Sequence, residues 1–152
     1  EEAVSAREGL RLARIAKHAG ANVIAGGCAF GNLAQETLLT GLVDAVVTGE
    51  GEETLVELVQ AFECSDTQSA LGLVKGIGFL NGNKPVVTEP RPLIKDLDTL
   101  PVPAYDLLPV SEYGKASKNH PALCSIEHSR GCTCSCSYCV LWRHMGKKIM
   151  DQ

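Results

Sequence analysis

The sequence predicts an α/β protein in which short apolar strands alternate with amphipathic helices. Two apolar runs, 21–25 and 45–47, are each followed by a glycine-containing turn and then by a helical apolar stripe. This alternation with short links is typical of a parallel sheet covered by helices. The same unit continues through a hairpin to residue 88. A proline-rich linker over 89–121 then leads to a cysteine-rich segment over 122–152.

Composition excludes several classes of protein. The chain has 152 residues, enough for one domain or parts of two. Its hydrophobic content of 45% and charged content of 21% are those of an ordinary globular protein rather than a disordered one. A net charge of −4 disfavours a nucleic-acid-binding surface, which needs clustered Lys and Arg. No apolar run approaches the roughly 20 residues of a membrane span.

The start and the end of the chain bear on its location and on its extent. The chain opens on Glu1 without a basic stretch or an apolar core, so no signal peptide is visible. With its unpaired cysteines, this predicts a reducing, cytoplasmic location. We also expect the chain to be a piece of a longer protein, because it does not begin with Met and stops soon after the cysteine-rich loop.

The first part of the chain is predicted to hold three helices. Over 1–19 apolar residues recur at i, i+3, i+4 and i+7, and Gly20 follows as a C-terminal cap. A second helix is expected over 32–40. A third follows 48–53, where acidic residues suit the positive end of a helix dipole. The apolar stripes are Leu12, Ile15, Ala16 and Ala19, then Leu33, Leu38 and Leu39, then Leu55, Leu58, Val59 and Phe62.

The second part is predicted to contain a polar loop over 64–70 and a hairpin. Two strands, 74–80 and 85–88, flank Asn81-Gly82, a strong hairpin turn signal. Five of the seven prolines then fall within 89–110, which favours an extended connector. Its apolar residues indicate that it is pinned to a surface; they are Leu93, Ile94, Leu97, Leu100 and Leu107. A strand over 123–127 and a helix over 140–150 are expected on either side of the cysteine loop.

Glycines follow both predicted strands of the first unit. Gly26 and Gly27 come after the first strand, and Gly49, Glu50 and Gly51 come after the second. In parallel sheets ligands bind where loops leave the carboxyl ends of the strands. Glycine there allows the backbone to approach a ligand closely, although a tight turn without any ligand explains it equally well.

The cysteine loop has a metal-ligand spacing. Cys132, Cys136 and Cys139 follow C-x3-C-x2-C, and Tyr138 stands just before the last. Three thiolates on a short loop can wrap one 4Fe-4S cluster, which normally takes four cysteines. Three ligands therefore leave one iron open to a small chelating molecule, as a catalytic metal site keeps an open position.

Two other interpretations of the loop stay open. Structural zinc sites usually draw two ligand pairs from separated segments, and no second C-x2-C or H-x3-H pair exists here. Disulfide-rich loops belong to secreted chains with many spread cysteines. A non-catalytic electron-transfer or zinc-binding module would use the extra Cys134 as a fourth ligand.

The loop resembles the signature of the radical SAM superfamily. By that resemblance Cys132, Cys136 and Cys139 would hold a 4Fe-4S cluster, and S-adenosylmethionine would bind the open iron and be cleaved to a 5′-deoxyadenosyl radical. Tyr138 would lie near the adenine. The resemblance also implies a small-molecule substrate, which the sequence does not identify, and an electron donor such as flavodoxin or ferredoxin.

A second resemblance covers most of the chain. Residues 26–38, 48–58 and 96–109 are similar to the second half of the cobalamin-binding domain, and to its linker, in cobalamin-dependent radical SAM enzymes. This implies a partial Rossmann-like domain over 1–88 and the first strand, cluster loop and helix of a truncated (β/α) barrel over 122–152. It also implies methyl transfer or other C–H-bond radical chemistry. The residues expected to line the cobalamin are Gly26, Gly27, Gly49, Glu50 and Gly51.

The sequence departs from that family in two places. Members often continue Gly-Gly with Pro-His, where this chain has Cys28 and Ala29, and the Asp-x-His-x-x-Gly motif that supplies a lower cobalt ligand is absent. A methylthiotransferase, in which a Gly-Cys such as Gly27-Cys28 helps to hold an auxiliary cluster, is the alternative within the superfamily. The Gly49–Glu52 motif and the proline linker disfavour it. We expect the 152-residue chain by itself to be inactive.

Overall fold

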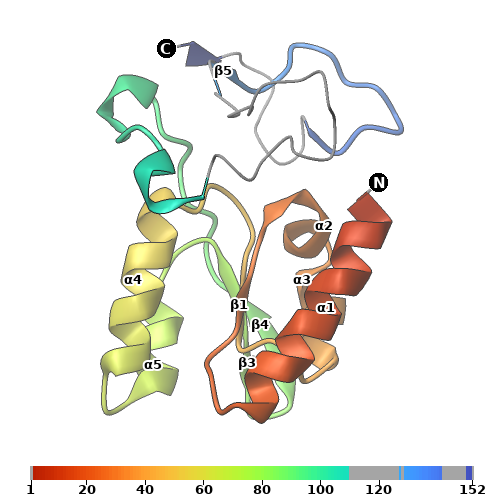
Figure 1. Ribbon diagram of the computed structural model, residues 1–152, viewed down its shortest axis with the longest axis vertical. Coiled ribbons are helices and arrows are strands. Elements are labelled where there is room, and N and C mark those ends of the chain that lie inside the picture. Colours follow the sequence, from red (N-terminus) through yellow and green to blue (C-terminus); the bar gives the residue numbers. More distant parts are fainter. Residues whose placement is uncertain (1, 110–126, 128, 142–149, 152) are drawn as a thin grey trace.

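The protein is built around a four-stranded mixed sheet with helices on both faces (Figure 1). The computed structural model describes residues 2–109, 127, 129–141 and 150–151. The strand order is β1-β2-β3-β4; β1 and β2 are parallel, and the other two pairs are antiparallel. The strands are β1 (Ile24–Ala25), β2 (Ala45–Val47), β3 (Ile77–Asn81) and β4 (Lys84–Val87).

The predicted α/β class is confirmed, but the parallel sheet is correct only for the first strand pair. Two helices, α4 (Glu52–Glu63) and α5 (Thr67–Leu73), separate β2 from β3. A single crossover helix would return the chain to the end of the sheet where β2 begins, and the next strand would then run parallel to β2. Here the second helix, α5, takes the chain back to the end where β2 finishes. Strand β3 therefore runs antiparallel to β2, with Val47 paired to Ile77.

Each face of the sheet has its own apolar core. Helices α4 and α5 cover one face, where Ala45 and Val47 pack with Leu58 and Ile77. The other face is covered by α1 (Glu2–His18), α2 (Gly27–Asn32) and α3 (Ala34–Leu39) (Figure 1). There Val46 packs with Leu38 and Ala13. Adjacent residues of β2 thus face opposite cores, as the two-residue period of a strand requires.

Helix prediction was least accurate where the helices are short. The first helix is confirmed as α1, and the predicted helix over 32–40 appears as the shorter α3. Helix α2, before it, was not predicted. The polar loop predicted over 64–70 is wrong, because α5 begins at Thr67. Asp66 caps α5 by accepting a hydrogen bond from the Ser69 N–H at 3.2 Å. An aspartate at this position is a local signal for a helix start, but the polar composition of 64–70 favoured the prediction of a loop.

The predicted hairpin is confirmed as β3 and β4. Asn81 pairs with Lys84, and Gly82 between them has a φ of +62°, a conformation that favours glycine. Gly78 of β3 has a different role. A Cβ there would lie 3.2 Å from Leu38 Cδ1 and 3.4 Å from Ala34 Cβ, so its missing side chain lets α3 pack closely on the strand.

The linker follows the surface of the α4 side. It contains two short 3-10 turns, η1 (Leu97–Thr99) and η2 (Tyr105–Leu107). Leu97 is buried, which confirms that this part is pinned, whereas Leu107 is 79% exposed. Among the helices that the structure describes, none has the length and apolar character needed to cross a bilayer.

The cysteine loop lies between the two strands of a short antiparallel pair. β5 (Ser129–Arg130) pairs with β6 (Met150–Asp151). The helix predicted over 140–150 is therefore wrong at its last residue, because Met150 pairs with Arg130 in a strand. Residues 142–149 of that predicted helix and residues 123–126 of the predicted strand lie outside the described part of the chain.

Candidate functional site

The parallel pairing of β1 and β2 brings the predicted glycine turns to one edge of the sheet. Ile24 pairs with Ala45 and Ala25 with Val46, so the carboxyl ends of both strands lie side by side. Gly26-Gly27 leave β1 at this edge, and residues 49–51 leave β2 there after Thr48. We call these five residues, Gly26, Gly27, Gly49, Glu50 and Gly51, the glycine edge.

The glycine edge leaves room next to the backbone. A Cβ added at Gly27, Gly49 or Gly51 would find no heavy atom within 4 Å. At Gly26 it would meet Val47 Cβ at 3.5 Å, an ordinary contact. Among these glycines, Gly27 is the one whose backbone conformation favours glycine, since its φ is +80°. This open space would allow a bound molecule to approach the backbone closely.

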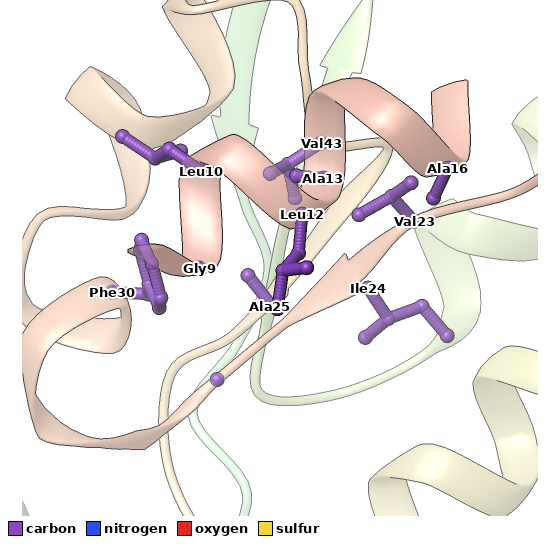
Figure 2. A pocket seen from close by; sticks show the side chains of 11 residues that line it. Gly9, Leu10, Leu12, Ala13, Ala16, Val23, Ile24, Ala25, Phe30 and Val43 are labelled. Atoms are coloured by element: carbon purple, nitrogen blue, oxygen red, sulfur yellow. The ribbon is translucent and has the colours of Figure 1, made fainter. Parts of the chain in front are cut away.

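An apolar pocket adjoins the glycine edge at Gly26. It has a volume of about 400 Å³ and lies between α1 and β1. Figure 2 shows Leu12 reaching from α1 toward Ala25 of β1, and the side chains that line the pocket carry only carbon atoms. This size and apolar lining are those of pockets that take an apolar group of a ligand.

Glu50 differs from its glycine neighbours because its carboxylate is already engaged. Its side chain is only 3% exposed. Oε2 accepts a hydrogen bond from the Ile94 N–H at 2.5 Å, and Oε1 accepts one from Arg130 Nη1 at 2.9 Å. A buried carboxylate needs such partners to offset its lost hydration. Glu50 thus joins the loop after β2 to both the linker and the cysteine segment.

Arg130 is the other half of this contact, and sequence analysis did not single it out. Its Nη1, Nη2 and Nε atoms donate to three different carboxylates, those of Glu50, Glu52 and Glu127, at 2.9, 2.5 and 2.9 Å. We call these four residues the Arg130 clamp. No spacing rule predicts a pair separated by 80 positions; the adjacent cysteine motif was the only local pointer.

The Arg130 clamp stabilises the charged forms of Arg130 and Glu52. Burial by itself would lower the pKa of the Arg130 guanidinium, but the hydrogen bonds to Glu52, Glu50 and Glu127 outweigh it and raise that pKa above its usual value. For the Glu52 carboxyl, partial burial by itself would raise the pKa, because burial disfavours the charged form of either group. The hydrogen bond from Arg130 and the backbone N–H groups at the start of α4 outweigh it and lower that pKa.

The cysteine loop begins two residues after Arg130. Gly131 turns the chain with a φ of +96°, and the Cys139 N–H donates to the Cys136 carbonyl at 3.1 Å across a tight turn. Cys132 and Cys139 are partly buried, while Cys134 and Cys136 are exposed. Tyr138 on the turn is 89% exposed. The three predicted ligands therefore lie on one short, solvent-accessible loop.

The donor set of this loop fits an iron–sulfur cluster. None of the six described cysteines forms a disulfide, so the thiols retain the soft sulfur donors that such clusters use. Within the described ranges, no three His, Cys, Asp or Glu side chains gather closely enough to hold a single metal ion. Cys132, Cys136 and Cys139 stay the predicted ligands on the basis of spacing and donor chemistry.

Comparison with known proteins places the chain in a family. No family model matches it. It is 37% identical over 106 residues to an uncharacterized methyltransferase of Pyrococcus horikoshii, covering 70% of this chain and 22% of that protein. It is 34% identical over 117 residues to the anaerobic magnesium-protoporphyrin IX monomethyl ester cyclase of Cereibacter sphaeroides, covering 72% and 19%. The chain belongs to the cobalamin-binding radical SAM family.

A further relative of this radical SAM chain is the hopanoid C-3 methylase of Methylococcus capsulatus. The two are 33% identical over 107 residues, which is 70% of this chain and 19% of the methylase. The chain spans about a fifth of the length of the curated relatives it matches. The family predicted from the cysteine loop and the glycine turns is confirmed.

Proposed function

We propose that this chain is part of a radical SAM enzyme that carries a 4Fe-4S cluster on Cys132, Cys136 and Cys139 and cobalamin at the glycine edge. The observation that carries the proposal is the Arg130 clamp. It links the segment just before the cysteine loop to Glu50, in the middle of the glycine edge. The clamp thereby joins two stretches, far apart in sequence, that are proposed to bind the two cofactors.

The cysteine loop is suited to hold a cluster and its chelating ligand. A cluster with one open iron supplies single-electron reduction of S-adenosylmethionine, from which this family draws its radical chemistry. Three cysteines within eight positions can wrap one cluster. The exposed ring of Tyr138 offers an aromatic face on which adenine can stack.

The glycine edge is suited to a large, partly apolar cofactor. Gly27, Gly49 and Gly51 leave the backbone uncovered, and the apolar pocket beside Gly26 extends this surface. Cobalamin there would lie next to the Arg130 clamp. The protein's role would be to bind it against exposed backbone and to hold the cysteine loop nearby.

The relatives suggest the class of reaction. One is a methylase, one is a methyltransferase and one is a cyclase. We propose methyl transfer to carbon or ring formation on a small molecule, with an electron donor such as flavodoxin or ferredoxin supplying the reducing equivalent.

The test is spectroscopic and uses the purified protein expressed from its full reading frame. After anaerobic reconstitution with iron and sulfide, low-temperature EPR is recorded on the reduced protein with and without S-adenosylmethionine. A 4Fe-4S signal that changes on addition supports the open iron. A signal indifferent to S-adenosylmethionine, or stoichiometric zinc, would instead indicate a non-catalytic electron-transfer or zinc-binding module.

A matched pair of cysteine variants tests the ligand assignment. Cys136→Ala is expected to abolish cluster binding, because two remaining thiolates cannot hold the cluster. Cys134→Ala, the control, removes a neighbouring exposed thiol and should leave the iron and sulfide content unchanged. The measurement is iron and sulfide per chain after reconstitution. Loss of the cluster in the Cys134→Ala protein would contradict the three-ligand assignment.

A further inference from the structure

The Arg130 clamp joins two stretches that the sequence keeps far apart, residues 50–52 and residues 127–130. The Arg130 side chain is 9% exposed, and its guanidinium donates to carboxylates from the loop after β2, from the first turn of α4 and from the residue three positions before it. Each of its three nitrogens has its own carboxylate. Only the flat, forked guanidinium can meet three acceptors in this way; an ammonium group has the charge but not the geometry.

The clamp is anchored most firmly at Glu50. That carboxylate is almost completely buried and also accepts the Ile94 N–H of the linker. Breaking a buried charge pair leaves an uncompensated charge, so the pair resists separation. The loop after β2, the linker and β5 therefore move together.

The cysteine loop starts directly from this anchor. Gly131 is the single residue between Arg130 and Cys132, and its positive φ sets the direction in which the loop leaves the strand. On the other side, Glu50 stands between Gly49 and Gly51 of the glycine edge. The clamp thus connects the segment that carries the predicted cluster ligands to the predicted cobalamin surface.

We propose that Arg130 is a positioning residue that fixes the cysteine loop, and any cluster it holds, at a set distance from the glycine edge. The part of this inference that concerns a bound cluster and cobalamin rests on the proposed function. Its structural part, a loop held in place by Glu50, applies equally to the protein without cofactors. The two parts call for separate measurements.

The first measurement needs no cofactor. In the apo-protein, the rate of iodoacetamide alkylation at Cys132 is followed by mass spectrometry, with the exposed Cys64 as an internal standard. Arg130→Lys and Glu50→Gln are each expected to raise the Cys132 rate about tenfold, the effect of losing about 1.4 kcal/mol of local stability. Together the two substitutions should add little to either alone, because both break one contact.

Arg91→Lys is the matched control. Arg91 is another largely buried arginine, 12% exposed, that pairs with two carboxylates, those of Glu53 and Glu57, but it belongs to the linker and not to the cysteine segment. Its loss should weaken a comparable ion cluster without changing alkylation at Cys132. An unchanged Cys132 rate in Arg130→Lys, or an equal rise in Arg91→Lys, would overturn the positioning role.

The second measurement uses a signature that stability alone does not change. Protein loaded with cob(II)alamin and a reduced cluster is examined by EPR for the magnetic coupling between the two centres. Arg130→Lys should retain its iron and sulfide content but show an altered coupling, whereas Arg91→Lys should match the wild type. Identical coupling in Arg130→Lys and wild type would contradict the proposal. Absence of a cluster in the wild type would refute the proposed function. The alkylation rates would still show whether Arg130 holds the cysteine loop in place.

Discussion

At the residue scale, two buried arginines join segments that are distant in sequence. Arg130 connects the cysteine segment to the glycine edge, and Arg91 connects the linker to α4. Arg91 donates to Thr54 Oγ1 at 2.8 Å and pairs with Glu53 and Glu57. Neither arginine stands out in a composition with 14 basic residues, because burial and partner geometry, which give them their roles, are properties of the fold.

Glu52 makes the Arg130 clamp sensitive to acid. Because its pKa is lowered in the folded protein, its contribution to stability is present above its ordinary value of 4.5 and is lost as the pH falls through the lower folded pKa. Glu52→Gln should therefore flatten the fall in melting temperature below that value while changing little near neutrality beyond a constant offset. Thermal unfolding followed over an acid pH series measures this. A Glu52→Gln curve parallel to the wild type throughout would contradict it.

At the element scale, the alternation of apolar residues and the turn signals predicted most helices and strands. Helix α1, strand β2 and the β3–β4 hairpin follow from local pattern alone. The short helices α2 and α5 do not, because each buries few residues and depends on its packing against a neighbour. In α5 only Leu71 is buried, so the helix has no repeating apolar pattern that the sequence could reveal.

The contact of α3 with β3 depends on a missing side chain. Gly78→Ala would place a methyl group 3.2 Å from Leu38 Cδ1 and 3.4 Å from Ala34 Cβ, so these neighbours must give by a few tenths of an ångström. We expect a loss of about 1–3 kcal/mol in the free energy of unfolding, as for other overpacked cores. Chemical denaturation monitored by circular dichroism measures it.

Gly72→Ala is the control for that substitution. A Cβ at Gly72 of α5 meets nothing within 4 Å, and alanine favours helix, so this variant should be unchanged or stabilised by up to about 1 kcal/mol. Equal destabilisation of both variants would show that close packing at Gly78 is not the cause.

At the scale of the whole molecule, several described contacts hold the linker to the sheet unit. They include the Arg91 ion pairs, the Ile94 N–H on Glu50 and the buried Leu97. The proline-rich composition predicted an extended connector, and the structure adds that its first half is fastened to α4 and the glycine edge. Glu50 serves both the linker and Arg130, which makes it the junction of all three segments.

Arg91→Ala should loosen this linker. Removal of the guanidinium leaves Glu53 and Glu57 without their partner and opens the chain after residue 90. Limited proteolysis should then cut within 92–109 about tenfold faster, as expected for a contact worth about 1.4 kcal/mol of local stability. Arg11→Ala, which removes an exposed pair with Glu8 inside α1, should leave that rate unchanged. Equal cleavage of the two variants would show that Arg91 does not secure the linker.

Several features of this chain can be recognised from local spacing in the sequence. The C-x3-C-x2-C loop, the glycines after two apolar strands and the Asn-Gly hairpin are local patterns, because each depends on bonds and dihedrals a few residues apart. Together they predicted the α/β class and the family.

The direction of β3 and the contact of Glu50 with Arg130 depend on the three-dimensional packing of the chain. The first depends on two helices packing side by side. The second depends on a buried carboxylate finding a guanidinium 80 positions away. Burial and long-range charge pairing arise when separate segments exclude water together, and no local pattern encodes which segments will do so.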